Sequence, residues 1–296
     1  MPGEKRPLLG FLGAGIMGSA MVLRLRERGW PVRVWNRDRS RLAPLATAGA
    51  DISPACPRAV VAASDIVLIC VRDAAAVEAC VFGTDGLAGG KAALVIDHST
   101  IPPAAARDIA ARLHRHNGSA WIDAPVSGGP AAAREGRLTI MAGGGAADLA
   151  RAAPVLADLA ANLTHMGATG AGQTAKMINQ VLVGTGFVLM AEALRLAEAS
   201  GIDAARLPDC LAGGLADSAL LQRIYRQMQQ RAFEPPASRA EVLLKDLAAA
   251  SDFARGLDLA LPMLELAARR YGDHVAAGHG QQDSAAILRL YERNPS

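Results

Sequence analysis

The sequence predicts an α/β domain with a mainly parallel sheet, followed by an all-helical domain. Three observations lead to this fold class. Short apolar runs alternate with helical stretches in the first half, glycines join the first run to the first helix, and long Ala/Leu-rich segments dominate after Gly172. Strands that alternate with helices form right-handed βαβ crossovers and a parallel sheet. We expect residues 1–168 to form the first domain and residues 169–296 the second.

Composition narrows the class of protein. The 296-residue chain is 51% apolar, 20% charged and 4% aromatic, which is typical of a soluble, helix-rich protein with a substantial core. The net charge of +3 comes without a dense Lys/Arg run, so we expect no nucleic-acid partner. Four cysteines without CxxC spacing favour reduced thiols and a cytoplasmic location.

The N-terminal apolar run Leu8–Leu23 has two further interpretations. It could be a secretory signal peptide, but no small-residue cleavage site follows it. It is also the stretch that comes nearest to membrane-span length, and glycines interrupt it. We therefore expect neither secretion nor a membrane partner.

Each element has a sequence signal. The helix Ser19–Arg28 should stop at Gly29, and the segment Gln173–Ser200 lacks proline and precedes Gly201, which predicts one long helix. The strands are predicted from compact apolar runs. They are Leu8–Leu12, Val32–Trp35, Ile66–Val71, Ala93–Asp97, a run beginning at Trp121, and Leu138–Ala142.

The first strand and helix are joined by the pattern Gly13-x-Gly15-x-x-Gly18. In a strand–turn–helix setting this pattern is the fingerprint of a dinucleotide-binding Rossmann domain. Gly13 makes the tight turn, Gly15 lets a pyrophosphate approach the backbone, and Gly18 lets the helix pack on the strand. The helix N-terminus then offers free N–H groups to the phosphates.

The end of the second strand indicates which dinucleotide binds. An acid that binds the ribose hydroxyls is usual there, roughly 20 residues after the glycines, but this chain has Asn36 and Arg37. Asn36 does not repel a 2′-phosphate, and Arg37, aided by Arg39 or Arg41, offers a cationic fork to bind one. We therefore expect NADP(H) to be preferred over NAD(H). The alternative is that these arginines form a solvated turn.

Two later glycine-rich stretches suggest a substrate site. Ser127, Gly128 and Gly129 follow a strand, so a hydroxyl and two amides could converge on a carboxylate; a turn that requires positive φ explains the two glycines equally well. Further along, Lys176 and Asn179 stand at i and i+3 on the predicted long helix and therefore share a face. A lone lysine on a helix is usually at the surface.

Five segments complete the pattern: GFLGAGIMG, DAPVSGG, GAGQTAKMINQ, LLKDLAAA and GQQDSA. In their order and spacing they resemble the signatures of the β-hydroxyacid dehydrogenase family over nearly the whole chain. The resemblance implies a Rossmann domain followed by an all-α domain, as in 6-phosphogluconate dehydrogenase. It also implies an NAD(P)-dependent oxidoreductase that interconverts a small hydroxy acid and its semialdehyde.

Within the family, the KMINQ continuation and the stretch Gly213-GLADSALL look most like tartronate semialdehyde (2-hydroxy-3-oxopropionate) reductases. The DSA beginning at Asp283 looks at least as much like threonate dehydrogenases, which tend to carry His where this chain has Asn179. 3-Hydroxyisobutyrate and L-threonate therefore remain alternative substrates.

The resemblance also implies roles for individual residues. Lys176 would protonate the carbonyl oxygen as hydride arrives, and Asn179 would orient the substrate or hold Lys176. Ser127, Gly128 and Gly129 would anchor the substrate carboxylate. The nicotinamide ribose would lie beside Thr100, and Lys245, with Asp246 behind it, would reach the cofactor or the substrate. The cofactor-binding set is then Gly13, Gly15, Ile16, Met17, Gly18, Asn36, Arg37, Val71, Arg72, Thr100, Lys245 and Asp246.

Acid catalysis by a lysine sets an electrostatic requirement. Desolvation or a neighbouring cation must lower the pKa of the ammonium toward neutrality. Lys245 could supply that cation, unless Lys245 and Asp246 are an ordinary solvated step on a helix. Relatives often carry an apolar residue at the position of His98, which precedes Ser99 and Thr100. Whether the surroundings of the nicotinamide are polar or apolar therefore stays open.

The other charged residues are assigned to structure or surface. The helical half carries Arg223, Arg226, Arg231 and Arg239, which we interpret as surface or subunit-contact residues rather than substrate ligands. His114 and His116 stand at i and i+2, where helical side chains face apart, and His165, His274 and His279 are treated as structural. We expect no metal site.

Three functions remain in view. A reductase or dehydrogenase for a small hydroxy acid requires Lys176 and the carboxylate pocket. An imine reductase on the same fold usually replaces this lysine with an acid or tyrosine. A non-catalytic dinucleotide-binding scaffold has no need of Lys176 and Asn179. We expect the active site in the cleft between the domains and, because the Ala/Leu-rich helices have excess apolar surface, a homodimer or homotetramer.

Overall fold

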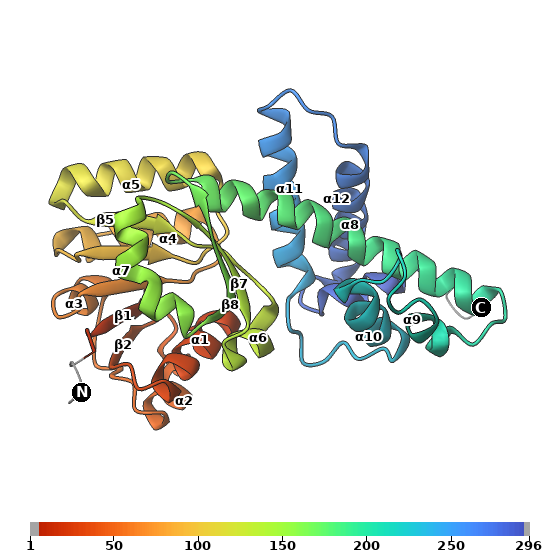
Figure 1. Ribbon diagram of the computed structural model, residues 1–296, viewed down its shortest axis with the longest axis horizontal. Coiled ribbons are helices and arrows are strands. Elements are labelled where there is room, and N and C mark those ends of the chain that lie inside the picture. The colour runs from red at the N-terminus through yellow and green to blue at the C-terminus, as the bar shows by residue number, and fades with distance from the viewer. Residues whose placement is uncertain (1–5, 293–296) are drawn as a thin grey trace. The chain divides into compact units, whose positions relative to one another are not determined.

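The computed structural model describes residues 6–292. The chain forms two compact units, Met1–Lys176 and Met177–Ser296, referred to below as the first and second units. Figure 1 shows a sheet with helices on both faces in the first unit and helices alone in the second. The predicted fold class, a Rossmann domain followed by an all-α domain, is confirmed.

The sheet of the first unit is eight-stranded within the described residues and has the order β2-β1-β3-β4-β5-β7-β6, with β8 also paired to β7. Strands β1 to β5 pair in parallel, whereas β7 runs antiparallel to β5 and β6. The carboxyl ends of the parallel strands therefore share one edge. The strands are β1 Leu9–Leu12, β2 Val32–Trp35, β3 Ile66–Ile69, β4 Leu94–Asp97, β5 Ala120–Asp123, β6 Val126–Ser127, β7 Leu138–Gly143 and β8 Ala160–Gly167.

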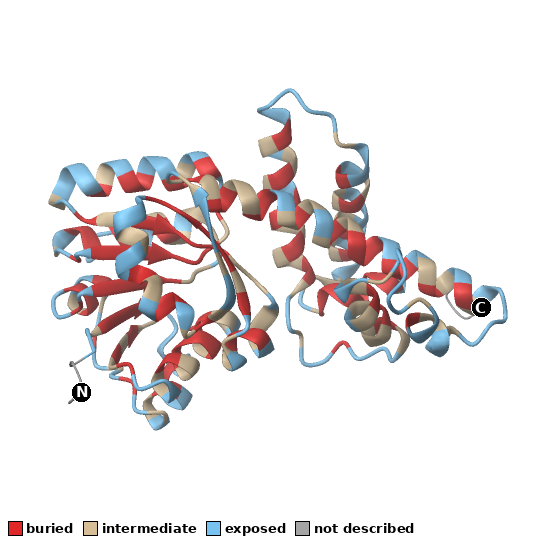
Figure 2. Ribbon diagram, in the orientation of Figure 1, coloured by how far each residue is buried: buried red, intermediate tan, exposed pale blue. Residues whose placement is uncertain are grey.

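Helices cover both faces of this sheet because the buried strands are apolar on both sides. Along β3, Ile66 and Leu68 face one core, while Val67 and Ile69 face the other. The first core also contains residues of α1 Ile16–Glu27, α2 Ala43–Thr47, α6 Gly129–Glu135 and α7 Ala146–Ala157. The second contains residues of α3 Pro57–Val61, α4 Ala74–Phe82 and α5 Pro103–Asn117. In Figure 2 most strands are accordingly red and the outer helix faces pale blue, whereas β8 is largely pale blue.

The second unit is built around the long helix α8, Ala171–Ala199, whose first residues belong to the first unit. Its core combines apolar residues of α8 with Leu243 and Leu247 of α11 and with the fully buried Tyr225 and Tyr271. The remaining α-helices are α9 Leu207–Cys210, α10 Arg226–Gln229, α11 Ala240–Arg255 and α12 Pro262–His274. A 3₁₀ turn Ala204–Arg206 precedes α9, π-helical turns Leu220–Tyr225 and Val275–His279 precede α10 and follow α12, and a 3₁₀ helix Ser284–Tyr291 lies at the end.

Helix α8 is long and apolar enough to cross a membrane by length and composition alone. Of its most apolar window, 44% is buried inside the protein. Four large apolar side chains of α8 are exposed: Ile178 (57%), Leu182 (67%), Leu189 (58%) and Leu196 (72%).

All six predicted strands are present, with ends that differ by a few residues. The predicted long helix is α8, and the first helix ends at Glu27, just before Gly29. Strands β6 and β8 were not predicted. β6 has only two residues, and β8 is mostly exposed with a polar composition, so neither carries the apolar pattern that marks a buried strand.

Candidate active site

The glycine loop after β1 is held in place by Asn36 at the end of β2. The Ala14 amide donates to Asn36 Oδ1 (2.9 Å), and Asn36 Nδ2 donates to the Asp38 carbonyl (2.7 Å). Both polar ends of the Asn36 amide are therefore engaged, and the ends of β1 and β2 are tied together. Helix α1 begins at Ile16 and Met17 with no side-chain cap at its N-terminus and no acid in its first turn.

The three glycines of this loop meet different demands. A Cβ on Gly13, which has φ +103°, would lie 2.3 Å from the Cys70 carbonyl oxygen, and one on Gly18 would lie 2.0 Å from the Gly13 oxygen. A Cβ on Gly15 would meet nothing within 4 Å. The fold itself therefore requires Gly13 and Gly18, whereas Gly15 leaves open the space that a pyrophosphate takes in such loops. The loop fits a dinucleotide.

Substitution of these glycines separates binding from folding. Gly15→Ala should keep the unfolding temperature of the wild type but lose NADPH affinity about tenfold or more, because the new methyl group occupies the phosphate space. Gly18→Ala is the contrast: its Cβ meets backbone, so it should lose about 1–3 kcal/mol of stability. Thermal unfolding with and without NADPH measures both. A Gly15→Ala protein that is still strongly stabilised by NADPH would show that the phosphates bind elsewhere.

The arginines that follow Asn36 have separate roles. Arg39 donates to the carbonyls of Ile52 (2.8 Å) and Pro54 (2.9 Å), and Arg41 pairs with Asp38 at 3.1 Å. Arg37 is exposed and, within residues 6–292, makes no hydrogen bond or ion pair. Of the three arginines expected near the ribose, Arg37 is therefore the one whose guanidinium is available to a phosphate.

The ends of β3 and β4 meet through Ser99. The Val71 amide donates to Ser99 Oγ (3.0 Å), and the Ser99 amide donates to Asp97 Oδ1 (2.9 Å). Arg72 pairs with the neighbouring Asp73 at 3.3 Å. The structure thus brings the predicted residue Val71 beside the loop that leads into Thr100. Ser99 was not among the predicted site residues, and its place beside Thr100 was the only sequence signal for it.

His98 lies in the interior, away from bulk solvent. It is 2% exposed and its Nδ1 lies 2.7 Å from the Ala124 carbonyl, to which it donates. Burial lowers the pKa of His98 to about 4 and raises the pKa of Asp97 to about 7. His98 is therefore neutral near pH 7, and its hydrogen bond links the residue after β4 to the residue after β5.

Lys176 lies near the start of α8, and this end of the helix is anchored to the sheet. Asp123, the last residue of β5, accepts from the amides of Gly170 (2.7 Å) and Gln173 (2.8 Å). The Gln173 side chain donates to the Ser99 carbonyl (2.7 Å) and accepts from the Ile101 amide (3.1 Å). Lys176 follows Gln173 by three residues and is itself 7% exposed. These contacts fix the lysine-bearing turn against the Ser99–Ile101 loop, which contains Thr100.

An acidic side chain such as Asp123 suits the N-terminus of α8 electrostatically. The α8 N-terminus is a positive dipole end, and the carboxyl group of Asp123 satisfies two of its backbone N–H groups. The pKa of Asp123 is nonetheless raised, because burial outweighs its hydrogen bonds to backbone amides. A Cβ on Gly172 would lie 2.4 Å from the Met141 oxygen and 2.5 Å from the Asp123 oxygen, so the helix start rests directly on the strands.

The Ser127–Gly129 turn connects β6 to α6. Gly128 has φ +130° and Gly129 has φ +78°, so backbone conformation by itself accounts for both glycines. A Cβ on Gly129 would meet nothing within 4 Å. The anchoring of a carboxylate by this turn stays a prediction.

The second unit joins the other predicted residues in one chain of contacts. Lys245 Nζ lies 2.8 Å from Asp246 Oδ1, Asp246 Oδ2 accepts from Gln180 (2.6 Å), and Gln180 accepts from Asn179 (2.8 Å). Asp246 and Gln180 are buried. Gln180 was not predicted as a site residue, although it stands in the KMINQ segment.

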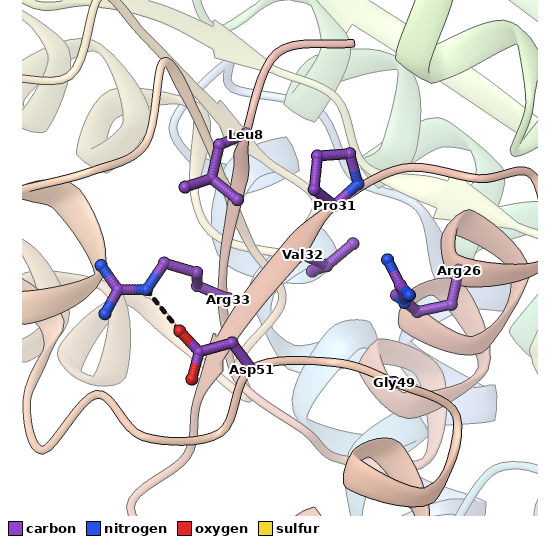
Figure 3. A pocket seen from close by; sticks show the side chains of 7 residues that line it. All are labelled: Leu8, Arg26, Pro31, Val32, Arg33, Gly49 and Asp51. Carbon is purple, nitrogen blue, oxygen red and sulfur yellow. Dashed lines mark hydrogen bonds and ion pairs between the residues drawn. The ribbon is translucent and has the colours of Figure 1, made fainter. Parts of the chain in front are cut away.

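Other sequence candidates lie elsewhere. Arg226 pairs with Asp209 and Arg231 with Glu198, as expected of surface arginines. Within residues 6–292 no group of three or more His, Cys, Asp or Glu side chains is arranged to hold a metal ion. Figure 3 shows a hollow at the amino ends of β1 and β2, where Arg33 pairs with Asp51 at 2.8 Å. Dinucleotides bind at the carboxyl ends of such strands, so this hollow is not the cofactor site.

Comparison with known proteins identifies the class. Residues 8–167 match the family model for the NAD binding domain of 6-phosphogluconate dehydrogenase, and residues 170–291 match that for the NAD-binding domain of NADP-dependent 3-hydroxyisobutyrate dehydrogenase. The chain belongs to the β-hydroxyacid dehydrogenase family. Like other members, it is an NAD(P)-dependent oxidoreductase that acts on hydroxy acids and uses a nicotinamide dinucleotide.

Three relatives illustrate the range of the family. The chain is 35% identical to 2-hydroxy-3-oxopropionate reductase of Escherichia coli, covering 96% of this chain and 97% of that protein. It is 32% identical to L-threonate dehydrogenase of Cupriavidus necator, covering 96% and 95%. The crystal structure of 3-hydroxyisobutyrate dehydrogenase from Salmonella typhimurium matches with a TM-score of 0.86 at 31% identity, covering 96% and 99%. These dehydrogenases act on different acids, so family membership leaves the substrate open.

Proposed function

We propose that this β-hydroxyacid dehydrogenase is an NADP(H)-preferring reductase of tartronate semialdehyde, with Lys176 as the proton donor. The observation that carries the proposal is the anchoring of the Lys176 turn, through Asp123 and Gln173, to the loop that contains Thr100. The likeness in Asn179 and KMINQ to the tartronate semialdehyde reductases supports the choice of substrate, as does the 35% identity to one of them.

The reaction needs one proton and one hydride. When bound, the reduced nicotinamide supplies the hydride to the aldehyde carbon. Lys176 donates a proton from Nζ to the carbonyl oxygen as its C=O double bond becomes a C–O single bond, and the resulting amine regains a proton from solvent. In the oxidation direction the same amine accepts the proton of the hydroxyl group. A proton donor placed in this way typically contributes about 10²–10⁴-fold to the rate.

The carboxylate of the substrate is assigned to the Ser127–Gly129 turn. The Ser127 hydroxyl and the amides of Gly128 and Gly129 can donate hydrogen bonds, and an ionised carboxylate accepts them. In the cofactor set, Gly13, Gly15, Ile16, Met17 and Gly18 would hold the pyrophosphate through backbone amides.

The remaining cofactor residues contact the rest of the dinucleotide in this proposal. Asn36 and Arg37 would face the adenine ribose, and Val71, Arg72 and Thr100 the nicotinamide half. Lys245 would contact the cofactor or the substrate, with Asp246 supporting it. We assign residues 1–168 to cofactor binding and residues 169–296 to substrate binding and assembly, and we place the enzyme in the cytoplasm.

The choice of substrate is tested by comparing kcat/KM for three oxidised substrates. We expect kcat/KM with NADPH to be highest for tartronate semialdehyde, lower for the oxidised form of L-threonate, and lowest for methylmalonate semialdehyde, which carries a methyl group in place of the hydroxyl. A site that hydrogen-bonds a hydroxyl rejects an analogue without it more strongly than an apolar pocket rejects one extra group. A preference for methylmalonate semialdehyde would assign the protein to the 3-hydroxyisobutyrate dehydrogenases instead.

Cofactor preference is predicted to depend on Arg37. Arg37→Ala should weaken NADPH binding by about 10–100-fold, because a hydrogen bond between charged groups contributes roughly 1.5–3 kcal/mol, while NADH affinity stays within about twofold. Arg41→Ala is the matched control, since Arg41 is already paired with Asp38. Fluorescence titration of the three proteins with each cofactor measures this. Equal losses for NADPH and NADH would refute the assignment of Arg37 to the 2′-phosphate.

The exposed stripe of α8 supports an assembly of two or four copies of this chain. Ile178, Leu182, Leu189 and Leu196 are all more than half exposed, and apolar surface of this kind is normally covered in an oligomer. Light scattering after size exclusion should give a dimer or tetramer, and Leu182→Glu with Leu189→Glu should shift it toward monomer. Lys91→Glu, on an exposed loop, should not. A monomeric wild type would overturn this part of the proposal.

A further inference from the structure

Four side chains of the second unit form a single line of polar contacts from α11 to α8. Lys245 and Asp246 stand on α11, and Asn179 and Gln180 stand on α8. The Gln180 amide bridges the two helices, with 2.6 Å between its Nε2 and Asp246 Oδ2, and 2.8 Å between its Oε1 and Asn179 Nδ2. Gln180 is 5% exposed and Asp246 6%, so water has little access to either.

The chemistry of these groups fixes the direction of every hydrogen bond in the line. An ionised carboxylate only accepts, so Asp246 Oδ2 must receive its hydrogen bond from Gln180, while Oδ1 forms an ion pair with the Lys245 ammonium. Gln180 must therefore turn its NH₂ group to Asp246 and its oxygen to Asn179. Asn179 must in turn donate with its own NH₂ group. Amide orientations are assigned from such networks, and here one acid determines two of them.

We propose that Gln180 is a positioning residue: Asp246 sets the orientation of the Gln180 amide, and the Gln180 amide in turn sets the orientation of the Asn179 amide. We call this coupling the relay. Its effect is that Asn179 turns Nδ2 toward Gln180, which leaves the carbonyl oxygen Oδ1 as the acceptor that Asn179 presents to a group outside these four side chains. Asn179 therefore recognises a hydrogen-bond donor: an ammonium such as that of Lys176, one helical turn earlier on the same face of α8, or a hydroxyl group of the substrate. This inference rests on the proposed function only in assigning Lys176 and Asn179 to the reaction.

The proposal is tested by variants that reverse the direction of the hydrogen bonds between Asn179, Gln180 and Asp246. Asn179→Asp sets a carboxylate against the Gln180 oxygen, so the unfolding temperature should fall by roughly 3 °C or more and kcat by about tenfold. When Asp246→Asn is added to Asn179→Asp, the new amide side chain at position 246 presents an NH₂ group to Gln180 from the side opposite position 179. Gln180 can then rotate and donate to the new carboxylate, whose second oxygen still accepts. Most of the lost unfolding temperature and part of kcat should return.

Two controls separate this relay from simple removal of negative charge. Glu241→Gln also removes a negative charge from α11, but Glu241 bonds Gln281 and lies outside the line, so it should not rescue Asn179→Asp. Gln180→Met retains the length of the side chain without its amide. In its presence, Asp246→Asn should no longer rescue Asn179→Asp.

The outcomes are distinct. Rescue that requires Gln180 establishes the relay. Rescue that persists with Gln180→Met, or that Glu241→Gln gives equally well, overturns it, as does the absence of any rescue. Unfolding temperatures report this coupling whether or not the protein is active. If the wild type reduces no acid semialdehyde, the proposed function fails while the relay is still tested.

Discussion

Lys176→Met should lower kcat for semialdehyde reduction by roughly 10²–10⁴-fold, the range for loss of a positioned proton donor. Methionine retains most of the buried stem of a side chain that is 7% exposed, so the fold and the affinity for NADPH should change little. The loss should therefore appear in kcat rather than in cofactor binding, because the proton moves only in the chemical step.

The control for this prediction is Lys91→Met. Lys91 is an exposed loop residue, and its replacement should leave kcat unchanged. Steady-state rates at saturating NADPH, together with NADPH titrations, measure both variants. If Lys176→Met retained more than about a tenth of the wild-type kcat, another group would have to be the acid.

Asp123→Ala should have the second large effect, first on stability. Asp123 satisfies two backbone amides at the start of α8, those of Gly170 and Gln173. Hydrogen bonds to a charged group contribute about 1.5–3 kcal/mol each, and the alanine variant leaves both amides buried without this partner. We expect the free energy of unfolding to fall by roughly 3 kcal/mol or more.

The same variant should also lose activity, because the anchored turn carries Lys176. Asp203→Ala removes a comparable cap, the acceptor for the Ala205 amide at an exposed 3₁₀ turn, and should cost about 1 kcal/mol with kcat unchanged. Urea unfolding and steady-state kinetics measure both. A kcat equal to that of the wild type in folded Asp123→Ala would mean that this cap stabilises the protein without positioning Lys176.

Much of the fold could be predicted because its signals are local. The glycine loop, the β2 end at Asn36 and the long helix α8 each follow from patterns within a few residues. Arg37 was predicted first, aided by Arg39 or Arg41, but the sequence could not show that Arg39 and Arg41 have partners of their own. Those partners are the carbonyls of Ile52 and Pro54 for Arg39 and the carboxylate of Asp38 for Arg41.

The anchoring contacts could not be predicted at all. Asp123 is distant in sequence from Gly170, and Gln180 from Asp246. The residues around each partner predict only the local strand or helix, and they do not indicate which distant residue it will contact. His98 shows a similar limit. Its position before Ser99 and Thr100 suggested a place near the nicotinamide, but the sequence did not show that its ring is buried, neutral and hydrogen-bonded to the Ala124 carbonyl.

The central claim, that this chain transfers hydride to an acid semialdehyde, is tested most directly with NADPH deuterated at the reactive nicotinamide carbon. Incubated with tartronate semialdehyde and the full-length protein, it should yield glycerate that carries one deuterium, as read by mass spectrometry. No deuterated product from this or the two competing semialdehydes, while NADPH still binds, would contradict the account and leave a dinucleotide-binding protein without this chemistry.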